Sequence, residues 1–194
     1  MAEMLDESSA IESTTVGVYR TAATVKGGRR FSFSALVVVG DRNGRIGVGY
    51  GKANQVPPAI EKAQKEAKRR MKRYPLTGRT LPHMVTGRFG SCEVRLIPAS
   101  PGTGVIASAS VRAPLEMLGV QDLLTKSFGS NNNKNLVKAV INGLEQLRTR
   151  ADVEELRGVE IGLSRVEEAT GRSRTKTGDG EGAAEGAAAE TAGA

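Results

Sequence analysis

The residue types that most often carry out chemistry are scarce in this chain, which holds one cysteine, Cys92, and one histidine, His83. One cysteine and one histidine cannot form a disulfide or complete a zinc or iron–sulfur site. A Cys–His nucleophile pair would also need a third orienting group and a pocket. We therefore interpret Cys92 as a small buried thiol and His83 as a surface or loop residue, and we expect no metal, no cofactor and no catalytic residue.

Two glycine-rich segments could bind phosphate through backbone N–H groups. The first, Gly44–Lys52, lacks the spacing of a Walker loop, because Ile46 and Ala53 stand where that loop needs a glycine and a hydroxyl. We expect a strand there whose glycines weaken it and allow another backbone to approach closely. The second, Pro101–Ser110, is faintly similar to the phosphate loop of galactokinase- and homoserine-kinase-type enzymes. Its nearest acid, Glu116, has no evident second carboxylate beside it, so we interpret the loop as a non-catalytic turn.

The ionisable residues are mostly basic and are unevenly placed. The chain has 28 Lys+Arg against 21 Asp+Glu, a formal net charge of +7. Residues 16–95 have 17 basic and four acidic residues, a net charge of +13, whereas residues 96–150 carry +3. Such an excess must be held against an acidic partner, either a nucleic acid or an anionic membrane surface. The basic segments lack the apolar face of a membrane-surface helix, which favours nucleic acid.

Neither a membrane span nor a signal peptide is expected. The longest strongly apolar stretch, about Ala35–Val39, is far shorter than the roughly 20 residues that cross a bilayer. The acidic start, Met1–Ser13, has no basic region of the kind that begins a signal peptide. With a single cysteine, the chain suits a reducing compartment. We therefore expect a soluble cytoplasmic protein.

Residues 16–78 are predicted to form a β-β-β-α unit. Val16–Lys26 and Arg29–Val39 predict a hairpin whose two-residue turn is Gly27-Gly28, with both φ angles positive, which would pair Lys26 with Arg29. Arg45–Gly51 predicts a third strand, and the prolines at 57 and 58 open a helix. The apolar stripe of that helix is Val56, Ile60, Ala63, Ala67 and Met71.

Residues 79–150 are predicted to form a separate α/β two-layer sandwich, so the fold class is α+β with two small domains. Strands are expected at 84–90, 91–97 and 105–109, an extended or mixed segment at 120–126, and helices at 111–118 and from about 136 to 147. The Ser130–Asn133 cluster supplies N-cap candidates for the last helix. Residues 1–15 and most of the acidic tail, 151–194, are predicted to be disordered.

The candidate RNA-binding residues lie on the basic hairpin and on the basic side of the first helix. Lysine and arginine contacts to phosphate position a protein without reading sequence, and the shape of the duplex and its 2′-OH groups supply the recognition. The candidates are Arg20, Lys26, Gly27, Gly28, Arg29, Arg30, Lys52, Lys62, Lys65, Lys68, Arg69 and Lys72.

Three blocks in order along the chain, Val25–Asp41, Gly44–Ala53 and Pro98–Gly104, closely resemble the bacterial small-subunit ribosomal protein five family. The resemblance runs from about Val16 to Arg150. It implies a variant double-stranded-RNA-binding domain in the N-terminal half. In the C-terminal half it implies the α/β fold shared with the kinases named above, used without catalysis.

The resemblance also implies a function and partners. Members of the family bind small-subunit (16S) ribosomal RNA where the head meets the body, contact the fourth and eighth proteins of the small subunit, and support translational accuracy. The hairpin-tip contact matches Lys26–Arg29, and the contact with the fourth protein matches the stretch around Gly104 and Arg112. The chain departs from the family at Ala23, where a lysine is common, and at Asn133, where a proline is usual.

We therefore expect a non-catalytic structural protein of the small ribosomal subunit, located on cytoplasmic ribosomes, with no membrane partner and no small-molecule substrate. Two alternatives remain open at this stage. The first is a free double-stranded-RNA-binding regulator, and the second is a small-molecule kinase built on the C-terminal domain.

Overall fold

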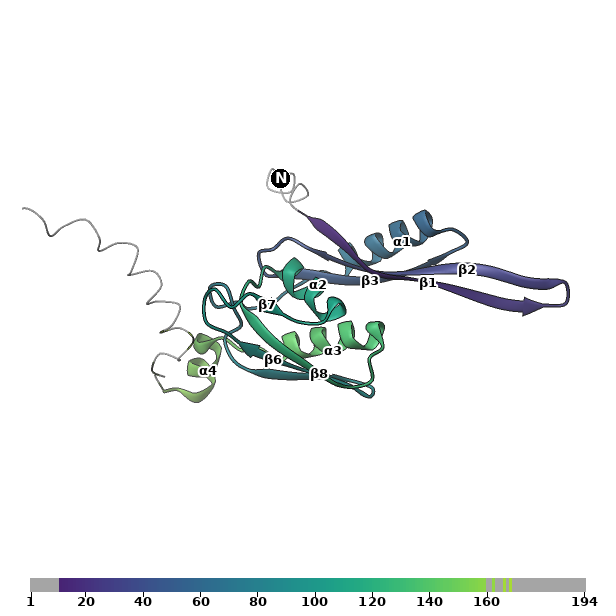
Figure 1. The fold of residues 1–194 in the computed structure, drawn as a ribbon. Helices are drawn as coiled ribbons and strands as arrows, with labels where there is room; N and C mark the ends of the chain where they lie inside the picture. Colours follow the sequence, from purple (N-terminus) through teal and green to yellow (C-terminus); the bar gives the residue numbers. More distant parts are fainter. Residues whose placement is uncertain (1–10, 160–161, 163–165, 167, 169–194) are drawn as a thin grey trace, which may run out of the picture.

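The computed structural model describes residues 11–159, 162, 166 and 168. The expectations for residues 1–10 and for most of 160–194 lie outside this described part. Two four-stranded sheets, the first with one helix and the second with two, form an α+β fold, as predicted (Figure 1).

The N-terminal domain is a β-β-β-α unit, as predicted. Its strands are β1 (Glu12–Val25), β2 (Gly28–Gly40), β3 (Arg45–Ala53) and β4 (Lys72–Arg73), which pair antiparallel in the order β1-β2-β3-β4. The single helix, α1 (Val56–Arg69), begins with prolines at its first positions. It packs on β2 and β3.

Glycines allow α1 to lie directly on β3. A Cβ added at Gly47, Gly49 or Gly51 would lie 2.0–2.2 Å from a backbone carbonyl oxygen of α1. The three carbonyls belong to Ala67, Ala63 and Ala59, which are also the three buried residues of the helix. The predicted close approach of a second backbone to this strand is therefore confirmed, and the glycine-rich segment is a packing surface.

The C-terminal domain has a mixed sheet, and each of its strands overlaps a predicted segment. The strand expected at 105–109 is shorter than predicted, and the extended or mixed segment expected at 120–126 is a strand that lies three residues later. The strands are β5 (Val85–Phe89), β6 (Cys92–Pro98), β7 (Val105–Ile106) and β8 (Leu123–Gly129), in the spatial order β5-β6-β8-β7. The β7–β8 pair is parallel and the other pairs are antiparallel.

Two helices pack against this sheet, and their ends follow local sequence signals. The first, α2 (Ala109–Leu118), ends at Gly119, whose φ of 99° is left-handed. The second, α3 (Asn133–Glu145), begins at the N-cap Asn132, whose side chain accepts the Lys134 N–H. A cap within the predicted Ser130–Asn133 cluster is thus confirmed.

The two domains share one hydrophobic core. Leu36, Val38 and Ile46 of the N-terminal sheet belong to the same buried cluster as Leu115 and Met117 of α2. The opposite face of β2 packs on α1 through a separate, smaller cluster. The turn after β2 also caps α2, since the backbone N–H groups of residues 42 and 44 donate to the carbonyls of residues 117 and 118 at 3.0 and 2.9 Å. The middle of β2 is therefore buried on both faces, by α1 and by the C-terminal domain.

The structure corrects three details of the prediction. The hairpin turn is Lys26-Gly27, and Val25 pairs with Gly28, so Lys26 does not pair with Arg29. Of the two glycines, Gly28 alone has a positive φ, 138°. The other two details concern the ends of the chain. Strand β1 already begins at Glu12, inside the segment predicted to be disordered, because residues 12–15 pair with the end of β2. The start of the predicted tail forms α4 (Arg150–Arg157), stabilised by a capping box between Thr149 and Asp152.

Candidate nucleic-acid interface

The hairpin of β1 and β2 extends beyond the body of the molecule (Figure 1). Every residue from 21 to 31 is exposed, so the tip is free to contact a partner. At the turn, a Cβ on Gly27 or on Gly28 would meet nothing within 4 Å. The candidates Lys26, Gly27, Gly28 and Arg29 therefore form an open basic tip with no packing role of their own.

The basic residues of the hairpin lie on both of its faces. Arg20 is paired with Phe33 and Thr24 with Arg29, which puts Arg20 and Arg29 on the face that carries α1 further along the sheet. The Arg20 guanidinium lies 3.9 Å from the centre of the Phe31 ring, which holds it in place. Arg30 pairs with Ala23 on the opposite face. The hairpin can thus contact phosphates from two sides.

The exposed side of α1 forms a second basic surface. Its buried side is the alanine stripe described above, while the candidates on the helix are all exposed. Of its two acids, Glu66 is neutralised by Arg70 at 2.9 Å and accepts the Tyr50 N–H at 2.9 Å. Four basic residues therefore remain without a carboxylate partner among the described residues: Lys62, Lys65, Lys68 and Arg69.

Two predicted RNA-binding residues lie apart from this surface. Lys52 pairs with Ser34, which places it on the sheet face that is turned away from α1. Lys72, on β4, forms an ion pair with Glu145 of α3 at 2.6 Å. The structure therefore places Arg20 and Arg29 on the same sheet face as α1, whereas Lys52 and Lys72 lie on the side of the C-terminal domain.

The loop that resembles a phosphate loop already binds an anion of this chain. The backbone N–H groups of Gly102 and Gly104 both donate to one carboxylate oxygen of Asp122, each at 2.9 Å, and Asp122 is buried. Nearby, the Arg112 guanidinium donates to the Val105 carbonyl at 3.2 Å. The predicted partner-contact residues Gly104 and Arg112 therefore flank the same short strand, β7.

The lone cysteine and histidine are not close partners in the structure. Cys92 is buried, and its thiol donates to the Ser130 carbonyl at 2.9 Å. His83 is exposed, and its Nε2 accepts the Arg148 N–H at 3.2 Å. In the part of the chain that the structure describes, no cluster of three acidic, histidine or cysteine side chains could hold a metal ion. No helix within this part is long and apolar enough to cross a membrane.

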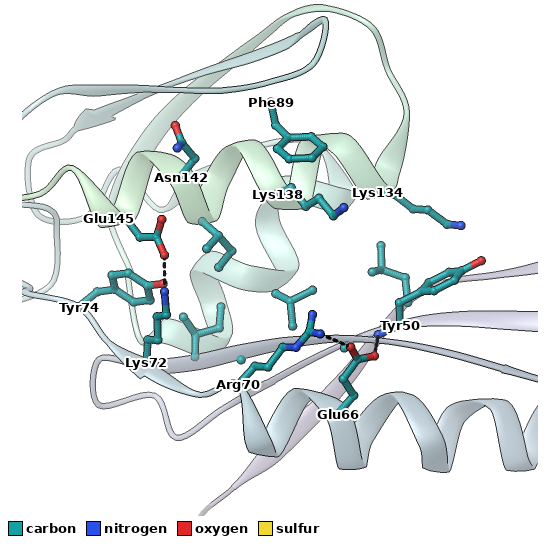
Figure 2. Close-up of a pocket in the computed structure, with 16 residues that line it drawn as sticks. Tyr50, Glu66, Arg70, Lys72, Tyr74, Phe89, Lys134, Lys138, Asn142 and Glu145 are labelled. Carbon is teal, nitrogen blue, oxygen red and sulfur yellow. Dashed lines mark hydrogen bonds and ion pairs between the residues drawn. The ribbon is translucent and has the colours of Figure 1, made fainter.

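A cleft between the domains contains residues that the sequence analysis did not single out. It has a volume of about 710 Å³ and lies between β3 and α3 (Figure 2). Tyr50, Phe89, Lys134 and Lys138 line it, and hydrogen bonds from Lys134 and then from Ser34 lower the pKa of Tyr50. The sequence does contain a signal for two of these residues, Lys134 and Lys138, because lysines four positions apart lie on one side of a helix.

Comparison with known proteins agrees with this architecture. Residues 11–75 match the family model described as the N-terminal domain of ribosomal protein S5, and residues 87–157 match that of its C-terminal domain. A protein of Rhodopirellula baltica named small ribosomal subunit protein uS5 is 54% identical over 144 residues, which cover 74% of this chain and 81% of the relative.

Two further relatives carry the same name. The protein from Rubrobacter xylanophilus is 52% identical over 158 residues, covering 81% of this chain and 79% of the relative. The protein from Syntrophobacter fumaroxidans is 54% identical over 157 residues, covering 80% of this chain and 95% of the relative. The two halves of the chain match the two domains of one ribosomal protein family in the same order, and the fold has the same two domains. The chain is therefore a ribosomal protein. The chain belongs to the ribosomal protein S5 family.

Proposed function

We propose that this chain is a structural, non-catalytic constituent of the small ribosomal subunit that binds small-subunit ribosomal RNA where the head meets the body. The RNA-binding surface consists of the hairpin tip and the basic side of α1. The surface around Gly104 and Arg112 contacts the fourth protein of the subunit, and the chain also contacts the eighth. By holding these components in place, the chain supports translational accuracy. The observation that carries the proposal is the match of both domains to one ribosomal family.

The geometry of the basic residues supports binding to RNA backbone. Those of the hairpin and α1 are exposed and have no carboxylate partner among the described residues, so their charge is available to phosphates. On the hairpin, the Arg20 guanidinium lies over the Phe31 ring and adds a positive charge that can contact phosphate. Contacts with phosphate and with the shape of a duplex, and not with base edges, are the mode that fits this surface.

The open face of the C-terminal sheet supports a protein contact. Ile97 and Ile106 both pair with Leu124, so the three side chains form one apolar row across β6, β8 and β7. Ile106 is 54% exposed and Leu124 37%. A hollow of about 310 Å³ beside this row includes Arg112 in its lining. An exposed apolar row with an arginine at its edge is typical of a protein interface.

Cosedimentation tests the proposal. The full chain is mixed with small subunits that lack it, washed at high salt and run through a sucrose gradient. Proteins held only by weak electrostatic contacts detach, because their association constant falls steeply with salt. For each neutralised phosphate, the logarithm of this constant falls by roughly 0.7–0.9 per tenfold increase in salt concentration. We expect about one copy per subunit to remain bound. A chain that runs free at the top of the gradient would instead favour the free RNA-binding regulator.

The kinase alternative is tested separately, by thermal unfolding with and without Mg-ATP. Because Asp122 occupies the N–H groups of Gly102 and Gly104, we expect no shift of Tm with nucleotide. A Tm that rises with nucleotide concentration would contradict the non-catalytic assignment.

A further inference from the structure

The cleft between the domains has an apolar floor and a basic edge. Leu36, Val48 and Ile141 contribute apolar side chains to its lining. Figure 2 shows Lys134 and Lys138, which extend from α3, at the same end of the cleft as Tyr50 of β3. The Lys72–Glu145 ion pair and Tyr74 lie at the other end.

The acids of the cleft are already neutralised, whereas two of its lysines are not. Glu66 is paired with Arg70, and Glu145 with Lys72, as described above. The ammonium groups of Lys134 and Lys138 instead lie over aromatic rings, 3.7 Å from the ring centre of Tyr50 and 4.6 Å from that of Phe89. Neither lysine has a carboxylate within ion-pair distance among the described residues. The cleft therefore carries an excess of positive charge where its aromatic rings are.

The two rings are accessible, since Tyr50 is 39% exposed and Phe89 41%. Partly exposed aromatic rings beside lysines and an apolar floor suit a ligand that is flat, apolar on its faces and negatively charged at one end. An unpaired nucleotide has these properties, because its base can stack on a ring while its phosphate binds an ammonium group. A base inside a duplex is stacked between its neighbours and cannot enter.

We propose that this cleft binds one unpaired nucleotide of an RNA, with its base against Tyr50 or Phe89 and its phosphate at Lys134 and Lys138. The proposal rests on the proposed RNA-binding function and adds a second, structurally distinct site to it. The hairpin and α1 contact the backbone of a duplex, and the cleft recognises a position where that duplex is interrupted. Such a pair of sites gives a preference for the shape of one RNA without reading its sequence.

Two RNAs test the proposal with the full chain. One is a perfectly paired hairpin, and the other is the same hairpin with a single bulged 2-aminopurine. We expect the bulged RNA to bind about tenfold more tightly, the effect of stacking one base on an aromatic side chain. We also expect the 2-aminopurine fluorescence to be quenched on binding, since the base then lies against a ring.

Matched variants locate the effect. The double variants Lys134→Gln/Lys138→Gln and Tyr50→Leu/Phe89→Leu should each abolish most of the tenfold preference. The control Lys62→Gln/Lys65→Gln, on the exposed side of α1, should weaken the binding of both RNAs equally. The ratio of the two affinities should therefore stay unchanged. Circular dichroism and Tm checks confirm that each variant is folded.

Equal binding of the two RNAs by the wild-type chain would overturn the cleft proposal and leave the proposed function standing. A preference that survives in all cleft variants would place the unpaired nucleotide elsewhere and would equally overturn it. Failure to bind either RNA would contradict the RNA-binding function itself.

Discussion

The Asp122 carboxylate accepts a hydrogen bond from the backbone N–H of Gly104 at 2.9 Å, and the same oxygen accepts from Gly102 at the same distance. A phosphate-binding loop presents N–H groups of this kind to a ligand. Here a side chain from the residue just before β8 fills the position, and Asp122 is only 4% exposed. The loop before β7 is therefore held by the chain itself, and its shape is available as a fixed surface for a partner.

Replacing Asp122 tests how much this carboxylate stabilises the loop. Asp122→Ala removes the acceptor of two N–H groups, and we expect the free energy of unfolding to fall by about 1–3 kcal/mol. Asp122→Asn keeps an acceptor oxygen and loses the charge, so a smaller loss is expected. Urea denaturation of the three proteins measures the difference. Equal midpoints for wild type and Asp122→Ala would show that water replaces the carboxylate.

The close contact between β3 and α1 predicts that adding one methyl group on β3 strongly destabilises the protein. In Gly49→Ala the new Cβ would lie 2.0 Å from the Ala63 carbonyl oxygen, so the helix cannot stay on the sheet. We expect a loss of more than about 3 kcal/mol in the free energy of unfolding, or failure to fold. The matched control is Gly27→Ala at the hairpin tip, where nothing lies within 4 Å. A loss above about 0.5 kcal/mol in the control would show that the tip is structural.

The hairpin tip should contribute to the salt dependence of RNA binding. In Lys26→Gln/Arg29→Gln, we expect the slope of log K against log salt to decrease by about 0.7–0.9 for each residue that contacts a phosphate. The Tm should not change, because both residues are exposed and lie on the open hairpin. The control Arg95→Gln/Lys126→Gln removes the same charge from the C-terminal sheet. A decrease of equal size in that control would mean that net charge, and not the tip, sets the slope.

Patterns that depend on neighbouring residues allowed much of the fold to be predicted. The prolines at the start of α1, the Asn132 cap of α3 and the alternating strand residues each act within a few positions. The hairpin register was wrong by two residues, because the sequence Lys26-Gly27-Gly28 can place its turn in more than one way. A shift of two residues changes the pairing but keeps every side chain on the same face of the sheet.

Contacts between the two domains could not be predicted in this way. The sequence shows Leu36 and Val38 as part of an apolar run, but it does not show that the second face of β2 meets α2. The cleft is missed for the same reason, since Tyr50 and Lys134 are 84 positions apart and meet only when the domains pack. The exposed basic residues could be predicted without knowing how the domains pack, because the sequence itself shows which positions of a strand or helix are charged.

Tyr74 predicts a loss of stability at alkaline pH. Burial, and then the nearby Glu145 carboxylate, raise the pKa of Tyr74 to about 12 from 10.0. Because the folded-state pKa is higher than the unfolded one, the contribution is full below pH 10 and is lost as the pH rises toward 12. Tyr74→Phe cannot ionise and lacks this loss. Between about pH 9 and about pH 11, we expect the wild type to lose about 1 kcal/mol more than the variant. Parallel pH curves in urea denaturation would contradict the shift.

The shared core predicts that the two domains unfold together. Leu36, Val38 and Ile46 are buried against the C-terminal domain, so separating the domains would expose their side chains to water. Each fully buried aliphatic side chain contributes about 1.5–3 kcal/mol relative to exposure. The backbone hydrogen bonds from the turn after β2 to the end of α2 would also be lost. Neither domain should therefore be stable while the other is unfolded.

Hydrogen exchange followed by mass spectrometry measures this cooperativity. We expect the slowest amides of β2 and of α3 to exchange through one opening with the same free energy and the same dependence on urea. Val38→Ala should lower both values equally, by about 1–3 kcal/mol, although Val38 lies in the N-terminal domain. A variant that lowers protection in β2 and leaves α3 unchanged would show two independent units. In that case a fragment ending near Leu81 would fold and bind RNA alone, which the buried face of β2 argues against.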